Sequence, residues 1–317
     1  MRRAAACWQG DRDKLAAVYG EGERSRLEPL VSWVPLNEAE VVLTTWGMPR
    51  LDAAYLDRAA ALRCVFYAAG SVRPFVTAES WQRGVRVVSA WELNAVPVAD
   101  FTLGVILLSL KRAFALSRAM RENRAVDPEA IAGTYGSRVG LVSLGAVGRL
   151  VRERLRPFEV RVAAFDPFLT EEEARCLEVE RMELEDLFAV CDVVSIHTPL
   201  LPATRGMIDG RLLRRMPPRA TLVNTARGAI VREEELIEVL RERADLHAVL
   251  DVTDPEPAAP SSPLRSLPNV MLTPHVAGSV GPERRRLGAA MVEEVERYVR
   301  GEPLRRELTA ERADLLA

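Results

Sequence analysis

The sequence predicts an α/β protein built from two lobes, each with a doubly wound parallel β-sheet. Its 317 residues are too many for one small module and suggest about two domains. Short runs rich in β-branched and aromatic residues alternate with segments of helical periodicity in the first hundred residues, and again from residue 138 onward. Because parallel strands need a crossover between them, usually a helix, both series predict parallel pairing.

The first series is expected to contain short strands separated by helices. These strands are predicted at residues 4–8, 41–46, 64–68 and 85–89. The spacing of apolar residues predicts helices over 51–61 and 74–83 and a long apolar helix over 96–121. Residues 123–137 show no periodicity and carry Pro and Gly, so we expect a linker there.

The second series repeats this alternation. Its strands are predicted at residues 139–144, 161–165, 193–196, 221–223, 247–250 and 270–272. Helices are expected over 146–156, over 232–243, and over 282–300, where Pro stands at the start and Gly301 follows the end. Thr170 and Glu173 have the spacing of a capping box at the start of another helix.

Composition excludes several classes of protein. Hydrophobic residues make up 48%, enough to form a core, so a disordered chain is excluded. The net charge of −2 gives no basic excess for nucleic acid or for a membrane surface. The apolar stretch 101–110 is half of what a bilayer requires, and residues 4–8 are too short for a signal peptide. We therefore expect a cytoplasmic enzyme or ligand-binding regulator.

The four cysteines give no indication of a metal site or of disulfide bonds. They are Cys7, Cys64, Cys176 and Cys191. No two of them have C-x-x-C spacing and no His cluster lies near them, which argues against zinc and fits a reducing compartment.

A glycine-rich turn predicts a dinucleotide site. Residues 139–148 read Val-Gly-Leu-Val-Ser-Leu-Gly-Ala-Val-Gly, a buried strand that leads into a turn and a helix. Gly145 and Gly148 would let the backbone approach a pyrophosphate at the helix N-terminus, although Ser143 replaces the first glycine of G-x-G-x-x-G. Asp166 ends the next strand, where a carboxylate accepts from ribose hydroxyls and repels a 2′-phosphate, so NAD is favoured over NADP. A tight turn with a solvated Asp is the structural alternative.

Polar side chains follow five strands of the second series. They are Asp166, His197, Arg227, Asp251 and His275. Ligands of open parallel sheets bind at the carboxyl ends of the strands, so these side chains are expected at one edge of one sheet.

The three histidines have different expected roles. His275 follows Pro274, and Glu256 lies in the preceding strand-end loop; a carboxylate beside an imidazole favours its charged form and fixes the proton-bearing nitrogen. His275 is therefore a candidate proton donor. His197 has no acidic partner nearby in sequence and is interpreted as a pocket wall, and His247, at a strand start, as a packing or surface residue.

Arg227 is the candidate carboxylate-binding residue. It lies in Asn-Thr-Ala-Arg-Gly at 224–228, and the guanidinium group matches a carboxylate through two hydrogen bonds. Gly228 would let the chain turn without crowding the ligand. In a chain this rich in arginine, a surface role is the structural alternative.

Taken together, these motifs resemble those of the D-isomer-specific 2-hydroxyacid dehydrogenases over essentially the whole chain. The matching segments are residues 140–148, Asp166, 197–200, 224–228, 251–257 and 269–278. The resemblance implies a flavodoxin-like substrate lobe over 1–95 and 287–317 and a Rossmann NAD lobe over 96–286. Within the family, the resemblance is to members of the phosphoglycerate dehydrogenase or glyoxylate/hydroxypyruvate reductase kind that have no regulatory domain. It also implies a homodimer formed through the NAD lobe, in which the helix over 96–121 takes part.

The resemblance also implies roles for individual residues. Arg227 would hold the carboxylate of a 2-oxo acid, and His275, supported by Glu256, would donate a proton to the carbonyl oxygen while NADH delivers hydride. Asp251 would accept from the nicotinamide carboxamide. The remaining expected cofactor-binding residues are Ser143, Gly145, Ala146, Val147, Gly148, Asp166, His197, Thr198, Pro199, Thr225, Ala226 and Gly278. The substrate-binding residues are expected to be Ala69, Gly70, Ser71, Asn94 and Arg227.

Some positions depart from the family pattern. Arg73 and Pro74 stand in the substrate loop, where Arg73 either favours an acidic or phosphorylated substrate tail or points to solvent. Thr253 and Arg232 replace residues usual in the family, an aromatic and an Asp. Two other functions remain. One is an idle NAD-sensing regulator of the corepressor kind. The other is oxidation of an inorganic or one-carbon substrate; for formate, Gln rather than Glu256 is expected. No metal, nucleic acid or membrane partner is expected.

Overall fold

The computed structural model describes residues 2–125 and 131–315, which divide into two compact units. Unit 1 comprises Met1–Asn94 and Ser279–Ala317, and unit 2 comprises Ala95–Gly278. The middle of the expected linker, 126–130, lies outside the described residues. The substrate-binding and NAD-binding roles expected of the two lobes remain predictions at this point.

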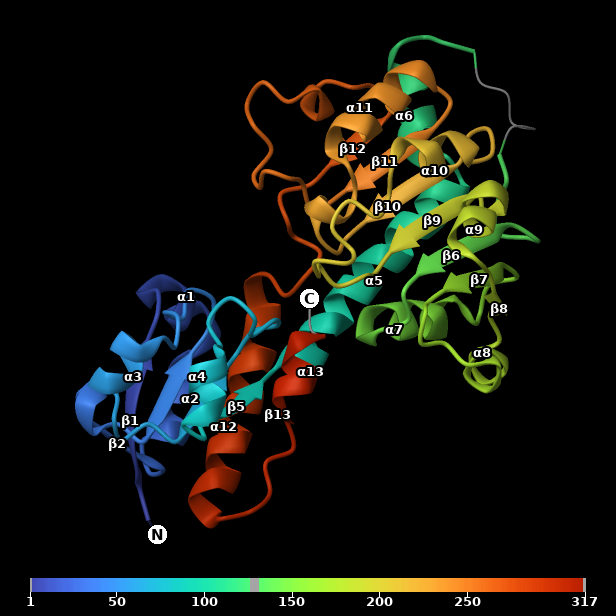
Figure 1. The fold of residues 1–317 in the computed structure, drawn as a ribbon. Helices are drawn as coiled ribbons and strands as arrows, with labels where there is room; N and C mark the ends of the chain where they lie inside the picture. Colours follow the sequence, from blue (N-terminus) through green and yellow to red (C-terminus); the bar gives the residue numbers. More distant parts are fainter. Residues whose placement is uncertain (1, 126–130, 316–317) are drawn as a thin grey trace. The chain divides into compact units, whose positions relative to one another are not determined.

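Unit 1 contains a six-stranded, mostly parallel sheet (Figure 1). Its strands are β1 (Ala4–Gln9), β2 (Val31–Trp33), β3 (Val41–Thr44), β4 (Cys64–Tyr67), β5 (Arg86–Ser89) and β13 (Glu307–Leu308). The order is β13-β5-β4-β3-β1-β2, and β13 alone pairs antiparallel, with β5. The order β2-β1-β3-β4-β5 is the flavodoxin-like order that the family resemblance implied.

Helices cover both faces of this sheet because successive strand residues alternate between two hydrophobic cores. One core joins the sheet to α1 (Arg12–Val18), α2 (Glu21–Leu27) and α12 (Arg284–Arg300). The other joins it to α3 (Ala53–Arg58), α4 (Ala78–Gln82) and α13 (Ala310–Asp314). A Cβ on Gly288 would lie 2.3 Å from the Val18 carbonyl oxygen, so only glycine allows α12 to pack this closely on α1.

Unit 2 contains a seven-stranded parallel sheet. Its strands are β6 (Arg138–Val142), β7 (Arg161–Phe165), β8 (Glu180–Arg181), β9 (Val193–Ile196), β10 (Thr221–Asn224), β11 (His247–Leu250) and β12 (Val270–Leu272). The order is β12-β11-β10-β9-β6-β7-β8, which is the predicted Rossmann arrangement with one further strand. The chain changes direction across the sheet between β6 and β9, and ligands of such sheets bind at this point.

Two helical layers enclose the sheet of unit 2. One core contains residues of α5 (Trp91–Leu110), α7 (Ala146–Leu155) and α8 (Glu171–Leu177). The opposite core contains residues of α9 (Leu184–Val190), α10 (Gly210–Arg215) and α11 (Glu233–Glu242). Short 3₁₀ turns lie at Leu36–Glu38, Gly228–Ile230, Pro263–Arg265 and Gly281–Glu283. Thr170 and Glu173 form the predicted capping box at the start of α8.

The single helix expected over 96–121 is wrong. The structure contains α5, which starts at Trp91, and α6 (Ala113–Arg121), separated by Arg112 in the left-handed conformation with φ 52°. The apolar pattern continues across Arg112, so periodicity alone could not reveal the break. By length and composition α5 could cross a membrane, but Ala99, Ile106 and Leu110 are buried in the core of unit 2, as in the core helix of a globular domain.

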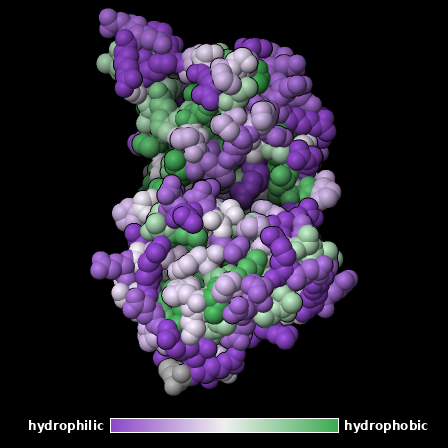
Figure 2. Space-filling view, turned by 90° about the vertical axis from the view of Figure 1, so that its left-hand side faces the viewer, coloured by the Kyte–Doolittle hydropathy of each residue, from purple (hydrophilic) through white to green (hydrophobic). Residues whose placement is uncertain are grey.

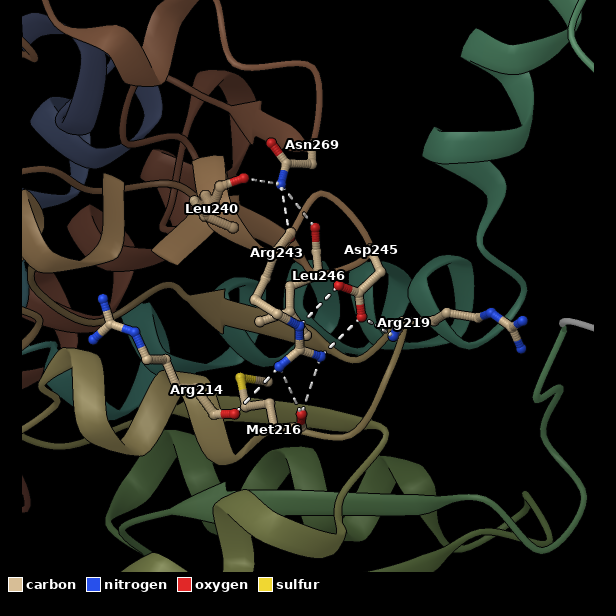
Figure 3. Close-up of polar contacts among 8 residues, drawn as sticks. All are labelled: Arg214, Met216, Arg219, Leu240, Arg243, Asp245, Leu246 and Asn269. Atoms are coloured by element: carbon tan, nitrogen blue, oxygen red, sulfur yellow. Dashed lines mark hydrogen bonds and ion pairs between the residues drawn. The ribbon is translucent and has the colours of Figure 1, made fainter. Parts of the chain in front are cut away.

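One ion pair and several hydrogen bonds connect three loops at the amino-terminal edge of the sheet of unit 2 (Figure 3). Arg243 donates to both carboxylate oxygens of Asp245, at 2.9 and 2.8 Å, and Asp245 also accepts from the Arg219 backbone N–H at 3.1 Å. Asn269, which is buried, donates to the carbonyl oxygens of Leu240 and Leu246 at 2.9 and 3.0 Å. Asn269 therefore anchors the entry to β12.

Replacing Asp245 with Asn should lower the free energy of unfolding by about 1 kcal/mol at pH 7, a value reduced for the partial exposure of the pair. The Arg243 guanidinium holds the pKa of Asp245 at about 2, below its ordinary 3.8. A lowered carboxylate pKa stabilises the fold above the unfolded value and loses this contribution as the pH falls. The difference between wild type and variant should shrink between about pH 5 and pH 2. Urea denaturation at several pH values measures the free energy of unfolding of both proteins. The control is Asp57→Asn, because Asp57 forms an exposed ion pair with Arg83.

The face drawn in Figure 2 is mainly hydrophilic, with hydrophobic residues in small groups between polar ones. Among the described residues, the exposed large apolar side chains are Trp33, Leu108, Met120, Tyr135, Phe168, Val190, Val280 and Leu315. They come from different elements of both units. Phe168 lies two residues after Asp166, beside the candidate cofactor site.

Candidate functional site

The glycine-rich turn after β6 is built to bring a backbone close to a helix N-terminus. A Cβ on Gly148 would lie 2.3 Å from the Ser143 carbonyl oxygen, so this position requires glycine. Gly145 is the N-cap of α7 and provides no side-chain cap for the first N–H groups of that helix. A Cβ on Gly145 would meet nothing within 4 Å, so space remains open over the turn. Free N–H groups at a helix N-terminus, next to open space, fit a pyrophosphate.

Ser143 has a role that the sequence did not reveal. Its φ of 78° lies in the left-handed region that favours glycine, which explains why glycine is usual at this position. Its hydroxyl donates to Asp166 Oδ2 at 3.1 Å, and the Leu144 N–H donates to the same oxygen at 2.8 Å. The Phe168 N–H donates to Oδ1 at 2.9 Å. Three donors therefore fix the orientation of the Asp166 carboxylate.

His197 lies at the switch point between β6 and β9. Its backbone N–H donates to the Val142 carbonyl at 2.8 Å, and its Cβ would lie 3.6 Å from a Cβ on Gly148. The side chain is 8% exposed, and neither ring nitrogen has a hydrogen-bond partner among the described residues. Burial lowers the pKa of His197 to about 3, so the ring is neutral. A buried polar group without a partner costs free energy, which fits a ligand contact at this position.

Thr198 and Pro199 continue from His197 and hold the following loop. Thr198 Oγ1 donates to the Val142 carbonyl at 3.2 Å, and the Pro199 carbonyl accepts from Thr204 Oγ1 at 2.6 Å. The segment after β9 is thereby fixed to the end of β6.

Arg227 follows β10 in a turn stabilised by Asn224. Asn224 Oδ1 accepts from the Ala226 N–H at 3.0 Å, and its amide donates to the Arg227 carbonyl at 3.0 Å. A Cβ on Gly228 would lie 2.1 Å from the Thr253 carbonyl carbon, so glycine lets the loop after β10 touch the loop after β11. Thr225, beside this turn, is buried and hydrogen-bonded to Thr102 at 3.0 Å.

Asp251 holds the segment that carries His275. It is 1% exposed, and its carboxylate accepts from Thr273 Oγ1 at 2.6 Å and from the N–H groups of Val276 and Ala277 at 2.8 Å each. Its backbone carbonyl accepts from the His275 N–H at 2.9 Å. The sequence assigned Asp251 to the cofactor alone; these four bonds also make it a positioning residue for His275.

His275 and Glu256 form a hydrogen-bonded pair at this same edge of the sheet. Imidazole Nδ1 contacts Glu256 Oε1, and both side chains are partly exposed on unit 2. His275 has φ 54°, a left-handed conformation, so the chain turns away from the direction of β12 at this residue. With Nδ1 bound to the carboxylate, Nε2 is the nitrogen that faces outward from the pair and can exchange a proton. The structure thus joins the two residues that the sequence paired.

The expected substrate loop lies at the carboxyl edge of the sheet of unit 1. Ser89 Oγ donates to the carbonyl oxygens of Ala69 and Gly70 at 3.0 and 2.8 Å. A Cβ on Gly70 would lie 3.2 Å from Asn94 Nδ2, and Asn94 Oδ1 accepts from the Ser279 N–H at 3.1 Å. Ser71 continues this loop. The expected residues Ala69, Gly70 and Asn94 are therefore neighbours in the fold.

His247 lies apart from these residues, as its position at a strand start suggested. It begins β11 at the amino-terminal edge and lines a cavity of about 250 Å³ together with Arg112 and Arg118. The candidate site lies at the opposite, carboxyl edge of the same sheet. Burial and these two guanidinium groups lower the pKa of His247, consistent with a packing role.

The sheet order of unit 2 and the glycine turn at the start of α7 define an α/β protein with a Rossmann-type unit. Residues 103–277 match the model of the "D-isomer specific 2-hydroxyacid dehydrogenase, NAD binding domain". The chain is 33% identical over 80% of its length to a glyoxylate reductase of Korarchaeum cryptofilum, covering 77% of that protein. It is 30% identical over 88% of its length to a D-3-phosphoglycerate dehydrogenase of Archaeoglobus fulgidus, of which it covers 52%. The chain belongs to the D-isomer specific 2-hydroxyacid dehydrogenase family.

Solved structures agree with this fold. A protein of Thermus thermophilus superposes with a TM-score of 0.76 at 29% identity, covering 97% of this chain and all of that one. A phosphoglycerate oxidoreductase from Rhizobium etli superposes with a TM-score of 0.81 at 23% identity, covering 98% and 99%, and supports the fold alone. The chain spans about half the length of the curated phosphoglycerate dehydrogenases that it matches. The matched domain binds a nicotinamide dinucleotide.

Proposed function

We propose that this protein interconverts a 2-oxo acid and a D-2-hydroxy acid with a nicotinamide dinucleotide. The observation that carries the proposal is the hydrogen-bonded pair of His275 and Glu256. The Asp251 carbonyl accepts from the His275 N–H and so holds this pair at the carboxyl edge of the sheet. The close approach of Gly228 to Thr253 brings the loop that carries Arg227 to the same edge. Reduction of a 2-oxo acid requires an acid–base group and a cation that can bind a carboxylate, and His275 and Arg227 both follow strands that end at this edge of the sheet.

The residues of this chain have separate tasks in the proposed reaction. Arg227 binds the substrate carboxylate and orients C2. His275 donates its Nε2 proton to the carbonyl oxygen as that oxygen gains negative charge, while Glu256 holds Nδ1 and stabilises the imidazolium before transfer. The nicotinamide, when bound, supplies the hydride to C2 in reduction or accepts it in oxidation.

The residues around the glycine turn fit the cofactor. The N–H groups of Ala146 and Val147 at the start of α7 would hold the pyrophosphate, with the neutral His197 beside them. Asp166, already oriented by three donors, would accept from the adenosine ribose. Thr225, Ala226, Asp251 and Gly278 are assigned to the nicotinamide end. We propose NAD as the cofactor, because an ionised carboxylate repels a 2′-phosphate.

Replacing Asp166 with Ala should relax this preference. The ratio of kcat/KM for NADH over NADPH should fall by at least about tenfold, because the variant loses both the ribose acceptor and the repulsion of the 2′-phosphate. Steady-state kinetics with both cofactors measure this ratio. The control is Asp192→Asn. The Asp192 carboxylate accepts from the Arg138 N–H at the start of β6, which is the amino-terminal edge of the sheet, away from the candidate site. An unchanged ratio in Asp166→Ala would remove this residue from the ribose site.

A spectrophotometric screen tests the proposed function itself. NADH oxidation should be seen with at least one of a dozen 2-oxo acids, including glyoxylate and hydroxypyruvate, which the similarity to a glyoxylate reductase favours. Tight NADH binding without turnover of any of them would support an NAD-sensing regulator instead.

We further propose that the protein is a cytoplasmic homodimer formed through unit 2, with α5 and α6 in the interface. Leu108 on α5 and Met120 on α6 are 45% and 68% exposed, apolar side chains suited to such a contact. Analytical ultracentrifugation gives the mass in solution.

A further inference from the structure

The cavity of about 250 Å³ in unit 2 lies at the amino-terminal edge of the sheet. Its walls come from the end of α5, from α6, from the starts of β10 and β11, and from the entry to β12. Every residue that lines it belongs to unit 2, and the candidate functional site lies at the opposite, carboxyl edge of the same sheet. The cavity is therefore separate from that site.

One face of α6 lines this cavity. The positions that contribute are Phe114, Ser117, Arg118 and Arg121. Their spacing of i, i+3, i+4 and i+7 places them on a single side of the helix. Arg112, the N-cap of α6, lines the cavity as well, and its left-handed conformation turns the chain between α5 and α6. Three guanidinium groups are thereby gathered around one cavity.

The positive charge of Arg118 is only partly balanced in the described part of the chain. Its ion pair with Glu122 is long, with 3.6 Å between Nε and Oε1, and Glu122 lies closer to Arg124, at 2.7 Å. Arg118 Nε and Nη1 are buried and have no hydrogen-bond partner among the described residues. Buried N–H groups without an acceptor cost free energy, and an anion in the cavity would supply acceptors.

Ser109 and the first turn of α6 add neutral donors to the same cavity. Ser109, near the end of α5, is 6% exposed, and its hydroxyl has no hydrogen-bond partner in the described part of the chain. Phe114 and Ala115 belong to the first turn of α6, whose N-cap provides no side-chain hydrogen bond. The first N–H groups of a helix have no partner within it, and together with the positive end of the helix dipole they favour oxyanions.

His247, at the start of β11, forms another part of the wall and can report on a bound anion. Burial, followed by the guanidinium groups of Arg112 and Arg118, lowers its pKa, while a backbone hydrogen bond with Asp245 and the charge of that residue act in the opposite direction. An anion held beside these arginines would raise the pKa of His247, because a nearby negative charge favours the imidazolium form.

We propose that this cavity binds a phosphate group, at a site separate from the one proposed for catalysis. A phosphate carries a charge of about −1.5 to −2 near pH 7 and has several acceptor oxygens, so it can engage more than one guanidinium group together with the Ser109 hydroxyl. The rest of the wall is apolar and leaves room for a short organic part beside the phosphate; it contains Phe114, Val249, Pro268 and Met271. Free phosphate and a small phosphate ester share this chemistry. The inference concerns binding alone and does not depend on the proposed reaction.

Equilibrium dialysis with inorganic phosphate tests the proposal. The protein is kept saturated with NADH, so that the glycine-rich turn after β6 is occupied. The wild type should bind a single phosphate per chain with a Kd of about 1 mM, and Arg118→Met should weaken this affinity at least about tenfold. Arg118→Lys should keep part of the affinity, since lysine retains the charge but not the fork of donors. Ser109→Ala should weaken it about threefold.

Arg211→Met is the matched control. Arg211 lies on α10, in the opposite helical layer, where it is exposed and pairs with Glu185. Its variant should keep the wild-type Kd within about twofold. Proton NMR locates the bound ion: phosphate should raise the pKa of His247 in the wild type and in Arg211→Met, and should leave it unchanged in Arg118→Met.

Glycerol phosphate, measured in the same way, distinguishes the two sources of the phosphate group. Binding at least about threefold tighter than that of inorganic phosphate identifies an ester as the ligand, and equal or weaker binding identifies free phosphate. The absence of saturable binding up to about 50 mM of either compound overturns the proposal. Unchanged affinity in Arg118→Met, or an equal loss in Arg211→Met, overturns it as well. If Arg118→Met altered the mass in solution without altering phosphate affinity, the cavity would belong to a contact between two copies instead.

Discussion

Replacing His275 with Asn is expected to lower kcat for 2-oxo acid reduction by at least about 100-fold, because the carbonyl oxygen loses its proton donor. Asparagine is chosen because it tolerates the left-handed conformation of residue 275, with φ 54°, so the segment from 273 to 277 should keep its fold. The affinity for NADH, measured by fluorescence titration, should stay close to that of the wild type. Stopped-flow absorbance of NADH gives the rate.

His247→Asn is the control for this variant, since His247 lies at the opposite edge of the sheet. Glu256→Gln should produce a smaller loss than His275→Asn, because it removes the charge that supports the imidazolium and keeps a hydrogen-bond acceptor beside Nδ1. If His275→Asn retained a near-normal rate, the proton donor would have to be another group.

Replacing Arg227 with Ala should lower kcat/KM for 2-oxo acids by about 1,000-fold, because two charge-assisted hydrogen bonds to the substrate carboxylate are lost together with its orientation. NADH binding should change little, since the pyrophosphate and ribose contacts come from the turn after β6 and from Asp166. Addition of guanidinium ion should restore part of the activity at low substrate. Kinetics with and without this ion provide the measurement.

Arg205→Ala is the matched control, since Arg205 is exposed and pairs with Asp254 in the loop that also carries Glu256. It should keep the wild-type kcat/KM within about threefold. If Arg227→Ala lost NADH affinity as strongly as turnover, its role would be to hold the fold of the loop after β10.

The parts of the fold that could be predicted are those fixed by local patterns. Strands β7, β9 and β12 begin and end where the apolar runs do, and the capping box at Thr170 starts α8 as expected. Short edge elements such as β2 and β8, and the short helices α1, α2 and α9, were not predicted, because their few residues take their conformation from packing rather than from periodicity. The break between α5 and α6 depends on the left-handed conformation of Arg112, and no Gly, Pro or Asn in the sequence indicates a turn there.

The candidate site shows the same division. The pairing of His275 with Glu256 could be predicted, since both follow strands that end at one edge and their chemistry is complementary. The contact between Ser143 and Asp166 could not, because it requires the positive φ of Ser143.

A single-turnover experiment tests the central claim most directly: enzyme in excess over NADH is mixed with a 2-oxo acid, and the product is separated on a chiral column. The account predicts one D-2-hydroxy acid formed for each NADH consumed, and a rate constant that falls at least about 100-fold in His275→Asn. A product of the opposite configuration, or NADH that stays bound and unreacted with every 2-oxo acid tried, would contradict it.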